Sequence, residues 1–149
     1  MESEAALKQE LHDMLSRAIV LKESDKVAIE IDNPLLIDYL RKELKELKHL
    51  TDGSFSPELV KMEYDAFSHI YEVTRTDEEK KTVRKRLTEL GIKQEYSLRS
   101  TITALLQYGG KKLAGKFGGE VAKDVVDIIC EHWKEIEGVI KEKAHEMFK

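Results

Sequence analysis

The sequence predicts an all-α protein: a single bundle-like domain over residues 1–149 with six or seven helices, and at most a short β element near residues 18–31. Apolar residues recur at spacings of three and four along most of the chain, which is typical of amphipathic helices. There are only two prolines and eight glycines, so helix-breaking residues are scarce. Apolar residues make up 41% and charged residues 36%, which suits helices with charged outer faces.

The first fifty residues predict two helices with a strand between them. A helix is expected over residues 4–21, with an apolar stripe formed by Leu7, Leu11, Met14, Leu15, Ala18 and Ile19. A second helix is expected from Pro34 to about Leu50, because Asp32 or Asn33 can cap its backbone N–H groups and proline suits a first turn. Between them, residues 27–31 alternate β-branched with other side chains, which predicts a strand.

A lone strand is not stable, so this one needs a partner. Residues 18–21 can fold back onto it across a turn at residues 22–25. The same strand of a second chain is another possible partner, since pairing in a symmetric dimer would satisfy an exposed edge. A third possibility is that the segment is extended without pairing.

Three more helices are expected between residues 56 and 108. The first begins at Ser56-Pro57, and its buried side is formed by Leu59, Val60, Tyr64, Phe67, Ile70 and Tyr71. The second begins after Thr76, whose spacing to Glu79 matches a capping box, and it ends at Gly91. The third covers residues 95–108, with an inward stripe of Leu98, Ile102, Leu105 and Leu106.

The glycine-rich segment 109–119 has two interpretations, a helix-packing groove or a loop. Gly110, Ala114 and Gly118 recur every four residues, and on a helix they would form a groove of small residues that allows close packing. Each helical glycine costs about 1 kcal/mol relative to alanine, which instead predicts a break near Gly109-Gly110 or Gly118-Gly119.

The last helix is expected over residues 119–137 and has the strongest apolar face in the chain. We predict that Val126, Ile129 and Trp133 are buried. The helix can continue past Gly138 as far as Met147. This face is wider than one neighbouring helix would cover, so part of it is available to a second subunit.

The net charge of −4 is unevenly distributed: −7 over residues 1–74, +6 over residues 75–123 and −3 over residues 124–149. These segments either neutralise one another within the fold or leave a basic face for an anionic partner such as nucleic acid. The candidate anion-binding residues are Lys80, Lys81, Arg84, Lys85, Arg86, Lys111, Lys112 and Lys116.

No catalytic residues, metal ligands or cofactor site are predicted, and an enzyme is the less favoured class. Residues 110–117 resemble a phosphate-binding loop, but Phe117 stands where a magnesium-binding hydroxyl is needed. Cys130 and His132 would point about 200° apart on a helix, so they cannot share a metal there. A single cysteine also excludes an internal disulfide.

The predicted function is that of a helical protein–protein interaction module, an adaptor or regulator that self-associates as a homodimer. The alternative is a nucleic-acid-binding protein that uses residues 75–123, with a helix-turn-helix at 77–108 that presents Arg99, Ser100 and Thr103. Bulky Leu87 at the helix crossing argues against that motif. The chain shows neither a signal segment nor a long apolar run, so we expect a cytoplasmic protein with no membrane partner.

Overall fold

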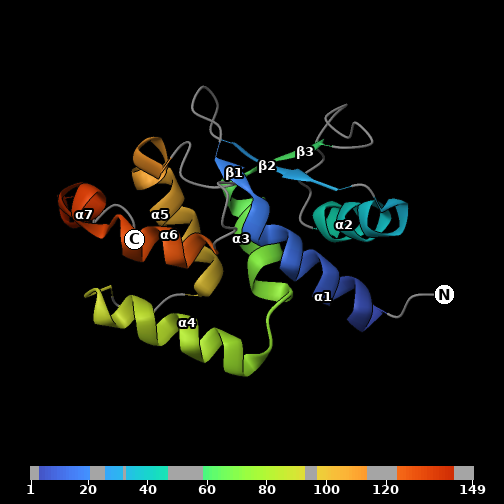
Figure 1. Ribbon diagram of the computed structural model, residues 1–149, viewed down its shortest axis with the longest axis horizontal. Coiled ribbons are helices and arrows are strands. Elements are labelled where there is room, and N and C mark those ends of the chain that lie inside the picture. Colours follow the sequence, from blue (N-terminus) through green and yellow to red (C-terminus); the bar gives the residue numbers. More distant parts are fainter. Residues whose placement is uncertain are drawn as a thin grey trace.

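The computed structural model describes residues 4–20, 26–31, 33–46, 59–92, 97–113 and 124–142 (Figure 1). In chain order the elements are α1 (Glu4–Met14), the 3₁₀ turn η1 (Leu15–Arg17), β1 (Ile19–Val20), β2 (Lys26–Glu30), α2 (Pro34–Glu46), β3 (Leu59–Glu63), α3 (Tyr64–Val73), α4 (Asp77–Glu89), α5 (Leu98–Leu113), α6 (Val125–Glu131) and α7 (Trp133–Glu142). Helices account for most of the described residues, so the predominantly helical class is confirmed.

The helices pack around a central pair, α3 and α5 (Figure 1). On one side of this pair lie the sheet, α1 and α2, and on the other side α7 packs against α5. The fourth helix, α4, runs along the lower edge in Figure 1 and contacts α6. One hydrophobic cluster extends from Leu11 in α1 to Ile140 in α7, so the described helices share a core.

The described strands form a three-stranded antiparallel sheet in the order β1-β2-β3. The predicted strand is β2, and its partner on one side is β1, with Ile19 opposite Ala28. Of the three alternatives, the structure therefore adopts the fold-back, through Ile19 and Val20. On its other side β2 pairs with β3 along its whole length, from Lys26 opposite Glu63 to Glu30 opposite Leu59.

The third strand corrects two expectations, because residues 59–63 were predicted to begin a helix and the β element was predicted to lie only near residues 18–31. Val60 and Met62 are fully buried whereas Lys61 and Glu63 are exposed, which is the alternation of a strand. The helical stripe begins only at Tyr64, where α3 starts. Pairing with β2, distant in sequence, therefore decides the structure of this segment.

The helix ends follow the local signals closely. The side-chain oxygen of Asn33 accepts a hydrogen bond from the Leu35 N–H at 3.0 Å, and Pro34 is the first residue of α2. The predicted capping box at Thr76 and Glu79 is present at the start of α4. Gly91, with a φ of 93°, follows the end of α4. The first helix is shorter than predicted, since it ends at Met14 and is followed by η1 and then β1.

Of the two places at which a break was expected, Gly109-Gly110 is excluded, because α5 continues through both glycines to Leu113. Gly109 is buried against α7, and a Cβ at this position would lie 3.5 Å from the side chain of Ile136. A methyl group at position 109 would therefore make ordinary van der Waals contact with α7, so this helix contact does not require a glycine. Residues 114–123, which include the other expected break at Gly118-Gly119, lie outside the described residues.

The predicted last helix is two helices, with Asp124 as the N-cap of α6 and His132 as a non-helical residue between α6 and α7. The bend lets α6 contact α4 while α7 packs against α5. Val126 and Ile129 are fully buried, as predicted. The expectation that Trp133 is buried is wrong, since it follows the bend and is only partly buried.

Candidate functional site

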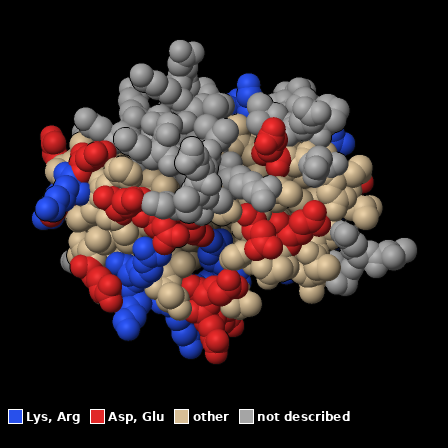
Figure 2. All heavy atoms as spheres, in the orientation of Figure 1, with Lys and Arg blue, Asp and Glu red and all other residues tan. Residues whose placement is uncertain are grey.

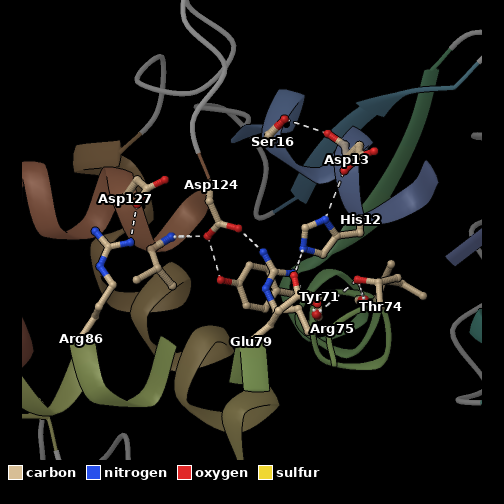
Figure 3. Close-up of polar contacts among 12 residues, drawn as sticks. His12, Asp13, Ser16, Tyr71, Thr74, Arg75, Glu79, Arg86, Asp124 and Asp127 are labelled. Atoms are coloured by element: carbon tan, nitrogen blue, oxygen red, sulfur yellow. Dashed lines mark hydrogen bonds and ion pairs between the residues drawn. The ribbon is translucent and has the colours of Figure 1, made fainter. Parts of the chain in front are cut away.

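The most concentrated polar cluster in the described residues joins α3, α4 and α6 (Figure 3). At its centre is Arg75, whose side chain is only 3% exposed and forms an ion pair with Asp124. One guanidinium nitrogen of Arg75 also donates to the backbone carbonyl of Tyr71 at 3.0 Å. The guanidinium carbon lies 3.3 Å from the centre of the Tyr71 ring, a cation–π contact. Arg75 therefore has a charge partner, a carbonyl and an aromatic face in compensation for its burial.

Asp124 connects this cluster to the start of α6. Its carboxylate accepts hydrogen bonds from the Tyr71 hydroxyl at 2.7 Å and from the Val126 N–H at 2.9 Å. One side chain thus caps a helix and neutralises a buried cation. Burial, followed by the nearby Asp124 charge, raises the pKa of Tyr71 well above its usual 10.0. The hydroxyl stays protonated near neutral pH and serves as a donor.

A second ion pair joins α4 to α6 near the surface. Arg86 pairs with Asp127, and both side chains are about two-fifths exposed (39% and 43%). The hydrogen bond from Arg86 to Asp127 raises the pKa of the arginine. Cys130 borders the same hollow, which is about 420 Å³. Burial raises the pKa of the Cys130 thiol, so this group is not an activated nucleophile.

His12 lies between two carboxylates and links α1 to α4 (Figure 3). Its Nε2 is 3.0 Å from Glu79 and its Nδ1 is 3.4 Å from Asp13. The Ser16 hydroxyl nearby donates to the backbone carbonyl of Asp13 at 2.7 Å and not to the imidazole. This arrangement differs from a nucleophile activated by histidine, in which a hydroxyl contacts the ring. The contact of His12 with Glu79 therefore holds α1 against α4.

The candidate anion-binding residues fall on two helices and one undescribed stretch. Lys80, Lys81, Arg84, Lys85 and Arg86 all lie on α4. Lys111 and Lys112 are in the last turn of α5, with side chains outside the described part, and Lys116 also lies outside it. Among the candidate residues whose side chains are described, all lie on α4.

The surface of α4 has mixed charge (Figure 2). Acidic residues occupy its first turn, and Lys80 lies 4.0 Å from Asp77. Arg86 is paired with Asp127, and Arg75 of the same basic segment with Asp124. Two arginines of the basic segment are thus neutralised by aspartates of the acidic C-terminal segment. Lys81 and Lys85 are exposed on α4.

Sequence reasoning missed a polar hollow of about 380 Å³ between α3 and α5. Its lining residues are Asp65, Ser97, Arg99, Ser100, Thr103, Ala104, Gln107 and Tyr108. Most lie on the side of α5 opposite the apolar stripe. This polar face was visible in the sequence, where Arg99, Ser100 and Thr103 were considered only as groups that read nucleic acid.

Among the residues that the structure describes, no group of three or more His, Cys, Asp or Glu side chains is placed to hold a metal ion. Within the same residues, no helix has the length and apolar character needed to cross a bilayer. No protein-family model, curated protein or solved structure matches this chain.

Proposed function

We propose that this chain is a helical protein–protein interaction module, an adaptor or regulator, that pairs with a second copy of itself. The observation that carries the proposal is the position of β3 at the edge of the sheet. Within the described residues, β3 pairs with a strand on one side only. The other side of such a strand presents backbone N–H and C=O groups that can pair with a strand of another chain.

The charges of β3 favour pairing with its own copy. If two β3 strands pair antiparallel about Met62, Lys61 of each copy lies opposite Glu63 of the other. Both side chains are exposed, and opposite charges across a strand pair are favourable. The buried face of each strand, with Val60 and Met62, stays on the same side of the joined sheet. The two three-stranded sheets then form one continuous sheet.

The strand proposed here for pairing between chains is β3, and it differs from the strand that the sequence suggested. Residues 27–31 were expected to meet their twin, but β2 is paired with β1 and β3 inside the chain. The wide C-terminal face is also largely covered internally, since Ile136 and Ile140 of α7 are buried. Self-association therefore depends on β3.

A five-residue strand is about 17 Å long, so its edge covers less area than a standard stable interface. We therefore expect weak pairing that depends on protein concentration. Sedimentation equilibrium over a range of concentrations tests it, and the Lys61→Glu variant tests the register. Lys61 is exposed, so this change leaves the core intact while it places a carboxylate opposite Glu63 of the other copy.

The second candidate function is nucleic-acid binding through α4, and it rests on Lys81 and Lys85. These exposed side chains are four residues apart, so they share one helix face. A gel shift with duplex DNA and RNA at low and moderate salt tests this alternative, with Lys81→Gln/Lys85→Gln as the variant. Binding that weakens steeply with salt and with the variant would support it. No shift at low salt with micromolar protein would remove it.

A further inference from the structure

The peripheral helix α4 makes little apolar contact with the rest of the described chain. Among its thirteen residues Leu87 is the buried one, whereas six of the ten residues of α3 and four of the seven residues of α6 are buried. Val83 and Leu90 lie on the same side of the helix as Leu87 but are only partly buried against the core. Because burial of apolar surface is the main force that holds packed elements together, α4 is held weakly by its apolar side.

Contacts between polar side chains attach both ends of α4 to other helices. In its first turn, the carboxylate of Glu79 lies 3.0 Å from Nε2 of His12 on α1. In its last turn, Arg86 forms an ion pair with Asp127 of α6. The four side chains are between 21% and 43% exposed, so water and dissolved ions weaken both contacts. Each contact is weak alone, and α4 therefore depends on both.

The end of α4 is closed by its own hydrogen bonds. The Ile92 N–H donates to the Leu87 carbonyl at 3.1 Å, and the Gly91 N–H donates to the Thr88 carbonyl at 2.9 Å. This pair of hydrogen bonds is a Schellman motif, which satisfies the last carbonyls of a helix. Together with the capping box at its start, it gives α4 two ends that are defined by the helix itself. A helix with its own caps and few outside contacts can open separately from the rest of a protein.

From these contacts we infer that α4 is a detachable cover over α6, which opens as one unit while the other described helices stay packed. The contacts at Glu79 and Arg86 determine how often it opens. The open state brings to solvent the apolar stripe of Val83, Leu87 and Leu90. Salt, which weakens the ion pair of Arg86, shifts the chain toward this state. The device is separate from the pairing through β3, because β3 and α4 lie at opposite edges of the molecule (Figure 1).

The test is hydrogen exchange of the full chain under native conditions, followed by NMR at individual amides. A detached helix of thirteen residues is marginally stable in water, so the opening of α4 appears as exchange of its own amides. Amides in the second half of α4 should exchange at least about tenfold faster than those in the middle of α3 and α5. Their protection factors should be similar to one another, because the helix opens as one unit.

Two classes of variant separate the opening of α4 from unfolding of the whole chain. Glu79→Gln keeps a residue that suits a capping box but removes the carboxylate beside His12, and it should speed exchange in α4 by about two- to threefold. Asp127→Asn should have a similar effect through Arg86. Ile29→Val changes a buried residue of β2, far from α4 in Figure 1, so its contacts are kept when α4 opens. It should speed exchange in α3 and α5 by about fivefold and leave α4 unchanged.

Salt and one further variant complete the test. Sodium chloride at about 0.5 M should speed exchange in α4 by about twofold, and this effect should be smaller in Asp127→Asn. Glu137→Gln removes an exposed ion pair with Lys141 inside α7, so it should leave α4 unchanged.

Exchange in α4 that is as slow as in α3 and α5 would overturn the inference. An equal response of α4, α3 and α5 to Ile29→Val would also overturn it, because α4 would then open only when the whole chain unfolds. Exchange in α4 that ignores both Glu79→Gln and Asp127→Asn would contradict the role of the two polar contacts. Each of these outcomes leaves the pairing through β3 untouched, since that pairing is measured by sedimentation.

Discussion

Arg75 and Asp124 form a buried ion pair that joins the end of α3 to the N-cap of α6, across 49 positions of sequence. Tyr71 contributes its ring to the arginine and its hydroxyl to the aspartate. Because Arg75 is almost fully buried, its charge depends on Asp124 for compensation. The pair fixes the position of α6 against α3 and α4.

Replacement of Asp124 with Asn should lower the free energy of unfolding by about 2–4 kcal/mol, because it leaves a buried cation without its counter-charge. Asn is also a good N-cap, so the helix cap is kept and the loss of unfolding free energy measures the ion pair alone. Asp127→Asn is the matched control, since its pair with Arg86 is about two-fifths exposed and should be worth less than about 1 kcal/mol. Urea denaturation measures both, and equal losses would contradict the account.

The Tyr71 hydroxyl predicts a decline in stability at high pH. The pKa of Tyr71 is well above 10.0 in the folded protein. The contribution of its hydroxyl to stability is therefore fully present below pH 10. It is lost as the pH rises further, because the unfolded chain releases this proton more easily than the folded protein does. Tyr71→Phe should cost about 1–2 kcal/mol at pH 7 through the lost hydrogen bond to Asp124. The variant should also flatten the decline above pH 10 in denaturation experiments. An identical decline in both proteins would refute this assignment.

For Glu79 we expect the opposite pH dependence, a loss of stability at low pH. The hydrogen bond from the Thr76 backbone N–H lowers the pKa of Glu79 from its usual 4.5. Its contribution is therefore present above about pH 4.5 and is lost as the pH falls further. Glu79→Gln should cost less than about 1 kcal/mol at pH 7, with the difference from the unmodified protein shrinking in acid. Glu78→Gln, an exposed neighbour, is the control and should show no such trend.

Three glycines should respond differently to alanine. Gly109 and Gly138 are helical, and alanine should raise the unfolding free energy by about 0.5–1 kcal/mol at each. At Gly109 the added methyl makes ordinary contact with Ile136, and at Gly138 it meets nothing within 4 Å. Gly91 has a φ of 93°, so alanine there should cost about 1 kcal/mol. A destabilising Gly109→Ala would show that α7 needs a closer approach to α5.

Local signals predicted most of the helices. Thr76 with Glu79 and Asn33 with Pro34 mark helix starts through contacts within a few residues, so they are visible in the sequence. The strand at residues 59–63 was missed because Leu59 and Val60 also fit the apolar stripe of the helix that follows. The bend at His132 was missed for a similar reason: one apolar stripe packs against two different helices.

The polar sites were less predictable. The pair of Arg75 and Asp124 joins residues far apart in the chain, and no local spacing indicates it. The uneven charge suggested that the segments neutralise one another, but it did not indicate which residues do so. For the hollow, Arg99 was visible on the polar face of α5, whereas its neighbour Asp65 on α3 became apparent only from the packing of the two helices.

Sedimentation equilibrium of the unmodified chain, Lys61→Glu and the charge swap Lys61→Glu/Glu63→Lys tests the central claim most directly. The account predicts a mass that rises above the 17.2 kDa monomer with concentration, a weaker rise for Lys61→Glu, and recovery in the charge swap. Lys81→Glu on α4 should associate like the unmodified chain, and circular dichroism should show each variant folded. A monomer at every concentration, or association that ignores both β3 variants, would contradict pairing through β3.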